Sequence, residues 1–157
     1  MKIVLLGKGA AGKDYLRKRF IERGARYGVS YTSRQPREGE VNGKDYLFIS
    51  REEFEQRIAN NEFVEYQEFN GWYYGMTKDV FEDCDAMILN VEGLALLSPE
   101  LRAKCFVIYL DIDKETRLQR LSERNDNQDS IERRIQADDN QFIGFTDYDL
   151  KITNPDF

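Results

Sequence analysis

The sequence predicts an α/β fold, a three-layer sandwich around a parallel central sheet, formed by one domain of 157 residues. Short apolar runs alternate with segments of helical periodicity, which is typical of parallel sheets covered by helices on both faces. A glycine-rich loop follows the first apolar run. Between positions 30 and 75 this alternation stops, and two Asn-Gly pairs stand among β-prone residues. These observations predict a small antiparallel subdomain inserted into the parallel core.

Four apolar runs rich in β-branched or bulky residues are the expected strands of the core. They are residues 3–6, 86–91, 106–110 and 148–152.

Three helices are expected between and beside these strands, because apolar residues recur there every three or four positions. Their ranges are 13–22, 114–124 and 130–142. Leu16 and Phe20 illustrate the i, i+4 spacing in the first helix, and Asp113 is a suitable N-cap for the second.

The inserted segment carries the strongest short-range turn signals. Asn42-Gly43 and Asn70-Gly71 both predict type I′ hairpins, since that turn needs a positive φ at its two central residues. A helix over 51–60 is expected between the two hairpins.

Composition excludes several classes of protein. Basic residues number 23 and acidic residues 29, so the net charge of −6 argues against a general nucleic-acid binder. The absence of histidine removes the commonest general base. Cys84 and Cys105 are expected to be reduced core thiols of a cytoplasmic protein. No signal peptide is expected, and no run approaches the roughly 18 apolar residues of a membrane span.

The glycine loop, GKGAAGKD at 7–14, fits two patterns. A phosphate-binding loop needs Lys directly after its last glycine, and Lys13 stands there. A dinucleotide fingerprint is also spelled by the glycines, but it needs an acid about 20 positions later. That region holds no acid, although Arg34 would suit a 2′-phosphate. The phosphate loop is favoured, with contacts expected from Gly7, Gly9, Ala10, Ala11, Gly12, Lys13 and Asp14.

Asp14 occupies the position where the phosphate loop usually has Ser or Thr. Its carboxylate would suit Mg²⁺, which accepts hard anionic oxygens. An acid in the first turn of a helix is also stabilised by the helix dipole. Both roles remain open from the sequence.

Residues 29–75 closely resemble the nucleoside-monophosphate-binding domain of guanylate kinases, and the resemblance covers nearly the whole chain. RLSERNDNQDSIERRI resembles the lid of that family, and KITNPDF resembles its late V-N-D stretch. The resemblance implies a P-loop NTPase-type sandwich with core 1–29 and 76–157, an inserted subdomain over 30–75 and a helical lid at about 120–134. The implied activity is transfer of the ATP γ-phosphate to GMP or dGMP, with Mg²⁺ bound to ATP.

The resemblance assigns roles to residues of the insert. It places Arg34, Arg37, Tyr46 and Tyr74 around the acceptor phosphate, where guanidinium forks match phosphate geometry. It places Ser30 and Glu65 at the base, because a carboxylate can accept from guanine N1–H and N2–H₂ together.

Two departures from the family pattern concern the base. Met76 stands where the family has Ser or Thr, and Thr77 is the possible substitute. Asn90 and Glu92 stand for an Asp-x-Asp, so Glu92 is expected to help position Mg²⁺ or the base.

The lid is expected to supply positive charge to the transferred phosphoryl group. The family's arginines match Arg124 and Arg134, with Arg120 as a further candidate, and Arg117, Arg120 and Arg124 form one basic stripe. Asn154 resembles an asparagine beside the donor base.

The expected partners are therefore small nucleotides, without nucleic acid or membrane, and the chain is expected to be a monomer or homodimer. Three alternatives remain open. They are a kinase of different or broader base specificity, a non-catalytic guanylate-kinase-like interaction module, and an NADP-binding reductase.

Overall fold

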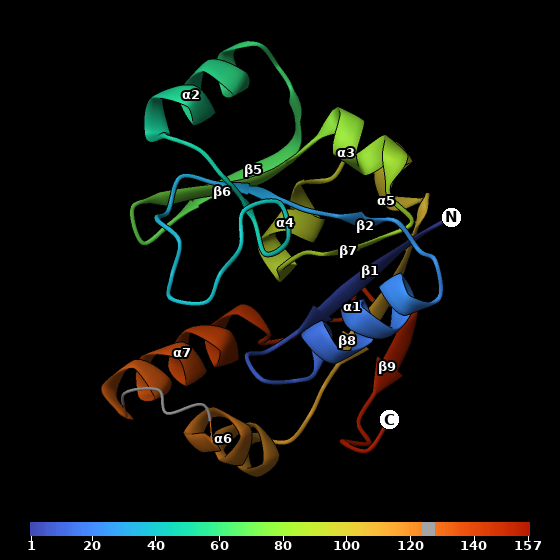
Figure 1. The fold of residues 1–157 in the computed structure, drawn as a ribbon. Coiled ribbons are helices and arrows are strands. Elements are labelled where there is room, and N and C mark those ends of the chain that lie inside the picture. The colour runs from blue at the N-terminus through green and yellow to red at the C-terminus, as the bar shows by residue number, and fades with distance from the viewer. Residues whose placement is uncertain (124–127) are drawn as a thin grey trace.

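A computed structural model describes residues 1–123 and 128–157 of the chain. Its core is a parallel sheet of order β2-β7-β1-β8-β9, as Figure 1 shows. The strands are β1 (Lys2–Gly7), β2 (Tyr27–Gly28), β7 (Ala86–Ile88), β8 (Cys105–Leu110) and β9 (Leu150–Ile152). The predicted α/β class and parallel central sheet are confirmed.

Both faces of this sheet are buried, because successive strand residues point to opposite sides. Val4 and Leu6 of β1 belong to one apolar cluster, and Leu5 belongs to another. Leu16 and Phe20 of α1 (Lys13–Glu22) cover the face of Leu5. The other face is covered by side chains from α3 (Lys78–Asp83), α4 (Val91–Leu96) and the segment after α7 (Gln128–Gln141). The three layers follow from this alternation.

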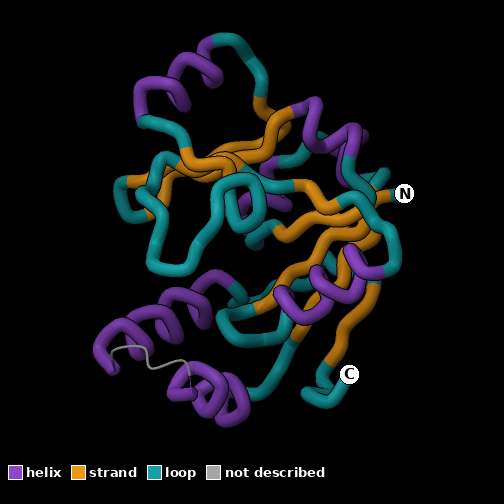
Figure 2. The backbone as a smooth tube through the Cα atoms, viewed as in Figure 1, coloured by secondary structure: helices purple, strands orange, loops and turns teal. Residues whose placement is uncertain are grey.

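The insert carries its own sheet of order β4-β3-β6-β5. Its strands are β3 (Tyr31–Thr32), β4 (Leu47–Phe48), β5 (Phe63–Phe69) and β6 (Trp72–Thr77), and α2 (Arg51–Ala59) precedes β5. Figure 2 shows these strands apart from the core sheet. Asn70 and Gly71 both have positive φ values, 51° and 79°, so the expected type I′ hairpin joins β5 to β6.

The hairpin expected at Asn42-Gly43 is wrong. Gly43 has a positive φ of 81°, but Asn42 does not, so the pair cannot form a type I′ turn. Asn42 instead pairs with Tyr46 through an isolated parallel bridge, and its Oδ1 accepts a hydrogen bond from the N–H of Phe48. Because β4 runs parallel to β3, the insert sheet is mixed rather than wholly antiparallel.

The strand expected over 86–91 ends at Ile88. Asn90 is the N-cap of the short helix α4, and its Oδ1 accepts from the N–H of Gly93 at 2.7 Å. Side-chain capping by asparagine stabilises a helix start, so the chain turns into a helix where its apolar run predicted a strand. The last strand is likewise shorter than expected, beginning at Leu150.

Two helices form the region expected to be a lid, and both lie on one side of the glycine loop in Figure 1. The helix α6 (Lys114–Glu123) begins after Asp113, whose Oδ1 accepts from the N–H of Thr116 at 2.8 Å, so the predicted cap is confirmed. Leu121 of α6 packs with Ile131 and Ile135 of α7. A further short helix, α5 (Pro99–Arg102), precedes β8.

Arg117, the first residue of the basic stripe expected on α6, is buried. The side chain of Arg117 is only 2% exposed, and its Nε donates to the carbonyl of Ile112 at 3.0 Å. Its Nη2 lies 3.8 Å from the Asp139 carboxylate of α7. Arg117 therefore joins α6 to its surroundings and does not face a ligand.

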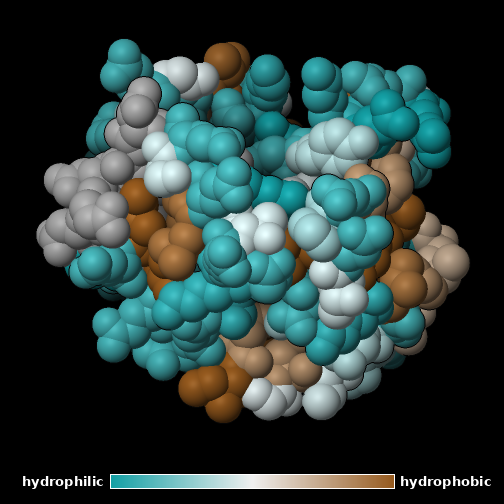
Figure 3. Space-filling view, turned by 90° about the horizontal axis from the view of Figure 1, so that it is seen from below, coloured by the Kyte–Doolittle hydropathy of each residue, from teal (hydrophilic) through white to brown (hydrophobic). Residues whose placement is uncertain are grey.

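The face seen in Figure 3 is mostly hydrophilic, with separate hydrophobic patches. None of the helices formed by the described residues is both long and apolar enough to cross a bilayer.

Two glycines of the β5–β6 hairpin should respond differently to alanine. At Gly71 a Cβ would meet nothing within 4 Å, so the cost comes only from its φ of 79° and should be about 1 kcal/mol. At Gly75 a Cβ would lie 2.8 Å from the carbonyl oxygen of Glu65 and from Cβ of Tyr66. Because backbone must move, we expect Gly75→Ala to lower the free energy of unfolding by roughly 3 kcal/mol in urea denaturation. An equal or smaller loss than in Gly71→Ala would contradict this packing.

Candidate functional site

Two cavities open beside the glycine loop and share the side chains of Lys13 and Asp14. The first, which we call the loop cavity, has a volume of about 400 Å³ and lies between the loop, α6 and the C-terminal residues. The second, the insert cavity, has a volume of about 500 Å³ and lies between the loop, the insert and α7. Lys13 therefore stands where the two cavities meet. Predicted residues that line the loop cavity are Ala10, Ala11, Gly12, Lys13 and Asp14.

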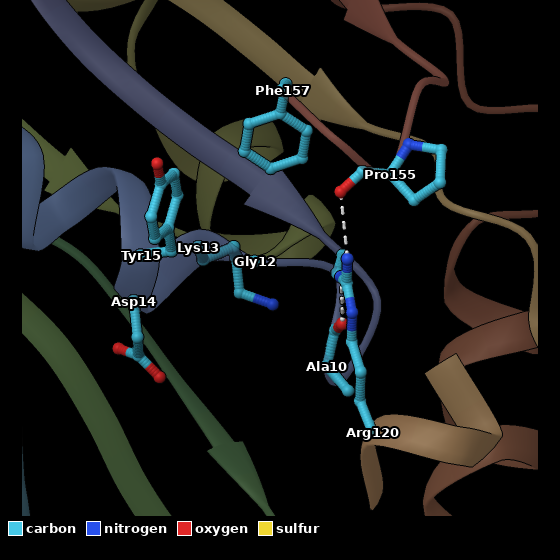
Figure 4. A pocket seen from close by; sticks show the side chains of 9 residues that line it. Ala10, Gly12, Lys13, Asp14, Tyr15, Arg120, Pro155 and Phe157 are labelled. Atoms are coloured by element: carbon cyan, nitrogen blue, oxygen red, sulfur yellow. Dashed lines mark hydrogen bonds between the residues drawn. The ribbon is translucent and has the colours of Figure 1, made fainter. Parts of the chain in front are cut away.

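Arg120 joins three parts of the loop cavity's wall. Its guanidinium donates to the carbonyl of Ala10 at 3.0 Å and to the carbonyl of Pro155 at 3.0 Å, as Figure 4 shows. At Gly12 a Cβ would lie 2.8 Å from the ring of Phe157. Gly12 also has a φ of 105°, a backbone conformation that side chains rarely adopt. The positive φ therefore favours glycine at the last loop position, and the ring of Phe157 packs closely over it.

The ammonium group of Lys13 is bound by carbonyl groups of the glycine loop. Nζ of Lys13 donates to the carbonyl of Gly7 at 2.5 Å and to the carbonyl of Lys8 at 3.1 Å. A Cβ on Gly7 would lie 2.8 Å from the carbonyl oxygen of Leu110, so the loop leaves β1 in close contact with β8. The helix α1 begins directly after the loop, which directs its N-terminal end at the loop's concave side.

Two acids of α7 contact this loop. The N–H of Gly9 donates to Oδ2 of Asp138 at 2.6 Å, and Nζ of Lys8 lies 2.8 Å from Oδ1 of Asp139. The pKa of Asp139 is lowered, chiefly by the hydrogen bond from Lys8. A backbone N–H that already donates to a carboxylate is suited to an anion.

The four residues expected around a phosphate group come together on the insert. The rings of Tyr46 and Tyr74 have centroids 5.9 Å apart, and Cζ of Arg34 lies 5.5 Å from the Tyr46 centroid. Tyr46, Tyr74 and Arg37 line the insert cavity. The guanidinium of Arg34 donates to Oε1 of Glu40 at 3.0 Å. The structure thus groups the four side chains within one cationic and aromatic cluster.

Glu40 is the acid that faces this cluster. Its burial would raise the pKa, but hydrogen bonds from the Arg34 side chain and from the N–H of Arg37 lower the pKa overall. The carboxylate therefore stays charged near neutral pH and holds Arg34 in place. Any anion entering the cluster must compete with Glu40 for that guanidinium.

Glu65 and Ser30 both line the insert cavity. The side chain of Glu65 is only 5% exposed, and burial raises its pKa to about 7. The N–H of Met76 lowers this pKa in part, whereas nearby Glu92 raises it further. A carboxylate so placed can accept hydrogen bonds from a ligand that offers adjacent N–H groups.

Gln67 lies two residues beyond Glu65 on the same face of β5, and its side chain also lines the insert cavity. Its Nε2 donates to Oδ1 of Asn90 at 2.6 Å, and Nδ2 of Asn90 donates back to its Oε1 at 3.0 Å. Only 8% of Gln67 is exposed. The two amides form a neutral, doubly bonded pair beside the acidic group.

Three other predicted contributors, Thr77, Glu92 and Asn154, lie away from the cavities, as does Met76. Met76 is fully buried in the core, and Thr77, 2% exposed, is the N-cap of α3. Glu92 is exposed on the first turn of α4 and does not line the insert cavity. The Oδ1 of Asn154 accepts from the N–H of Asp156, and Asn154 does not line the loop cavity. The roles suggested for Thr77, Glu92 and Asn154 stay predictions.

The two arginines expected to act from the lid have side chains outside the described part of the chain. Arg124 lies outside the described residues, and Arg134 lies in α7 with a side chain outside the description.

Sequence reasoning missed Gln67 and Asp138 as parts of the site. The first could have been found, since residues two apart on a strand share a face and Glu65 was already a candidate. For Asp138 the sequence holds no such signal, because its contact with Gly9 joins segments far apart in the chain.

Comparison with known proteins gives a consistent result across the whole chain. A family model described as guanylate kinase matches residues 1–157. The guanylate kinase of Lactobacillus delbrueckii subsp. bulgaricus is 34% identical over 162 residues, which cover 97% of this chain and 79% of that protein. The guanylate kinase of Geobacter metallireducens is 34% identical over 163 residues, covering 98% of this chain and 80% of that one.

A solved structure shows the same fold. The crystal structure of guanylate kinase from Anaplasma phagocytophilum superposes with a TM-score of 0.72 and 24% sequence identity. The match covers 98% of this chain and 76% of that chain.

The buried carboxyl of Glu65 predicts a pH-dependent stability. Because its folded pKa is raised from 4.5 to about 7, its contribution to stability is fully present below pH 4.5 and is lost as pH rises through 7. We expect Glu65→Gln to remove this loss, so that the variant gains roughly 2.5 kcal/mol over the parent protein between pH 5 and pH 8. Urea denaturation at both pH values measures it.

The exposed Glu52 of α2 provides the control, and Glu52→Gln should change stability equally at the two pH values. A constant difference between Glu65→Gln and the parent protein across this range would show that the carboxyl is not desolvated.

Proposed function

The chain belongs to the guanylate kinase family, and we propose that it transfers the γ-phosphate of ATP to GMP or dGMP, giving the diphosphate. The observation that carries the proposal is the meeting of two cavities at Lys13. One is bordered by the glycine loop and α6, and the other by the cationic cluster and the buried carboxyl of the insert. A donor nucleotide in one cavity and an acceptor nucleotide in the other can thus both reach the ammonium group of Lys13.

The loop cavity is the proposed site of ATP. Backbone N–H groups of residues 7–13 and the start of α1 would hold the β- and γ-phosphates, with Lys13 neutralising them. The γ-phosphate would then point toward the insert cavity. A phosphate at Gly9 must replace the carboxylate of Asp138, which now accepts from that N–H. Asn154 is proposed near the donor base.

The insert cavity is the proposed site of the acceptor nucleotide. Arg34, Arg37, Tyr46 and Tyr74 would bind its phosphate, and Glu65 would accept from N1–H and N2–H₂ of guanine, with Ser30 beside it. Adenine presents an acceptor at N1 and would be repelled by the carboxylate. Recognition of this kind can reject a wrong base by about 10⁴-fold.

Chemistry at this site depends on position and charge. The acceptor phosphate is already ionised near neutral pH, so its oxygen can attack the γ-phosphorus in line without a general base. The absence of histidine is consistent with this reaction. Lys13 would neutralise charge on the transferred group, and we propose Arg124 and Arg134 as further cations that approach when the lid, residues 120–134, closes.

Mg²⁺ is the proposed cofactor. No group of three or more His, Cys, Asp or Glu in the described residues could hold a metal by itself. Asp14 lines both cavities beside Lys13, so its carboxylate fits a cation held mainly by phosphate oxygens. Glu92 fits less well, since it lies outside both linings. When bound, the ion would neutralise charge on the β- and γ-phosphates.

Family membership rules out the reductase suggested by the glycine pattern. The cytoplasmic location and the monomeric or homodimeric state remain predictions, as does the division of the chain into core, insert and lid.

A panel of nucleoside monophosphates in a coupled ADP assay tests the activity. We expect kcat/KM for GMP or dGMP to exceed that for AMP, CMP and UMP by at least about 10³-fold, because of the pairing with Glu65. A preference for another base would overturn the substrate. Failure to phosphorylate any monophosphate, by a folded protein with ATP and Mg²⁺, would support the non-catalytic module instead.

In the same assay, Arg37→Ala should weaken binding of the acceptor nucleotide's phosphate group. Loss of one charge-assisted hydrogen-bonding fork costs about 2 kcal/mol, so kcat/KM for GMP should fall roughly thirtyfold while KM for ATP changes little. Arg23→Ala, at an exposed arginine after α1, is the matched control. A larger change in KM for ATP than for GMP would mean that Arg37 binds the donor nucleotide, which contradicts the proposal.

A further inference from the structure

We propose that Gln67, held in place by Asn90, donates a hydrogen bond to O6 of the acceptor guanine and is a second base-specificity residue beside Glu65. The inference rests on the proposed function, because it names a contact made by the same substrate in the same cavity. It assigns a role to a glutamine that neither the motifs nor the family resemblance pointed to.

The need for such a donor follows from two buried residues. O6 of guanine is an acceptor and lies next to the N1–H that Glu65 would bind. Met76 and Thr77, the residues after the Tyr74-Gly75 pair, were the expected source of a hydroxyl. Both are buried, 0% and 2% exposed, and neither lines the insert cavity. The donor must come from another element.

The orientation of the amide pair is set by the backbone. The N–H of Gly93 donates at 2.7 Å to one terminal atom of Asn90, so that atom must be the oxygen. The nitrogen of Asn90 then faces Oε1 of Gln67, and Nε2 of Gln67 faces the oxygen of Asn90. An amide nitrogen carries two hydrogens, and the pair uses one of those on Nε2. The second hydrogen is available to a ligand.

Gln67 and Glu65 present their polar atoms close together. A Cβ placed on Gly93 would lie 3.0 Å from Oε2 of Glu65 and 3.4 Å from Nε2 of Gln67. Both atoms therefore flank one point at the start of α4. A carboxylate acceptor beside an amide donor matches the guanine edge, which offers donors at N2 and N1 and an acceptor at O6.

Adenine has the opposite arrangement on this edge, with an amino group in place of O6. The N–H of Gln67 would face that amino group, as the carboxylate of Glu65 would face the acceptor at N1. Gln67 and Glu65 would thus both favour guanine over adenine. Lack of a hydroxyl at position 76 is compensated by a side chain on the neighbouring strand.

The test replaces Gln67 by Met, which keeps much of the volume and removes the donor, and by Glu. The carboxylate of Glu still accepts from Nδ2 of Asn90, but its second oxygen faces Oδ1 of Asn90. Substrates are GMP and inosine monophosphate, which has O6 but lacks the 2-amino group. We expect Gln67→Met to lower kcat/KM for both substrates by the same factor, roughly tenfold to a hundredfold. Gln67→Glu should lower both further, because its carboxylate repels O6. In Glu65→Gln the GMP to inosine monophosphate ratio should change instead.

A binding measurement separates recognition from a structural effect. The monophosphate of 2-aminopurine riboside is fluorescent and keeps the 2-amino group, but it has neither O6 nor N1–H. It should therefore bind more weakly than GMP, and without the contact that Gln67 would make. Its Kd should change less than twofold in Gln67→Met. Gln56→Met, at an exposed glutamine of α2, is the matched control for folding and activity.

Three outcomes would overturn the proposal. The first is a GMP kcat/KM in Gln67→Met within twofold of the parent protein. The second is an equal loss of affinity for the 2-aminopurine nucleotide, which would mean that Gln67 acts only through the shape of the cavity. The third is that Ser30→Ala, and not Gln67→Met, weakens binding of nucleotides with O6 while leaving the affinity for the 2-aminopurine nucleotide unchanged. Failure of the parent protein with every monophosphate would instead refute the proposed function itself.

Discussion

The close contact between the glycine loop and strand β8 is the constraint on which the site depends. The carbonyl oxygen of Leu110 would lie 2.8 Å from any Cβ at Gly7, so the chain can leave β1 along this path only with glycine there. The loop then closes on Nζ of Lys13 and passes directly into α1. Because β1 is the middle strand of the parallel sheet, this loop lies at the carboxyl edge where open α/β sheets bind ligands.

The two cavities differ in how their walls are held. The loop cavity depends on backbone contacts, since Arg120 donates to two carbonyls that belong to the loop and to the C-terminal segment. The insert cavity depends on side chains, namely the aromatic cluster of Tyr46 and Tyr74 and the amide pair of Gln67 and Asn90. A wall of backbone contacts suits the phosphate chain common to nucleotides, whereas side chains can distinguish one base from another.

Acidic groups near a site for polyphosphates need an explanation, because the chain already carries a net charge of −6. Several acids at or beside the cavities already have a partner, and one of them is desolvated. Glu40 pairs with Arg34, Asp139 with Lys8, and Asp138 accepts from the N–H of Gly9. Glu65 is desolvated, with a pKa of about 7. The approach of two nucleotides therefore rearranges existing charge pairs and does not simply fill a basic pocket.

The sequence by itself determined the α/β class, the glycine loop with Lys13, the β5–β6 hairpin and the grouping of Arg34, Arg37, Tyr46 and Tyr74 on one insert. The first three follow from local rules, namely apolar periodicity, the preference of Asn-Gly for positive φ, and motif spacing. The grouping of the four side chains was implied by the family resemblance. The Asn42-Gly43 hairpin failed because the side chain of Asn42 caps a neighbouring backbone N–H. Only the tertiary structure decided that Arg117 is buried, that Met76 and Thr77 leave the cavity and that Gln67 meets Asn90. Contacts between residues distant in the chain depend on which strands become neighbours, and no local pattern encodes that.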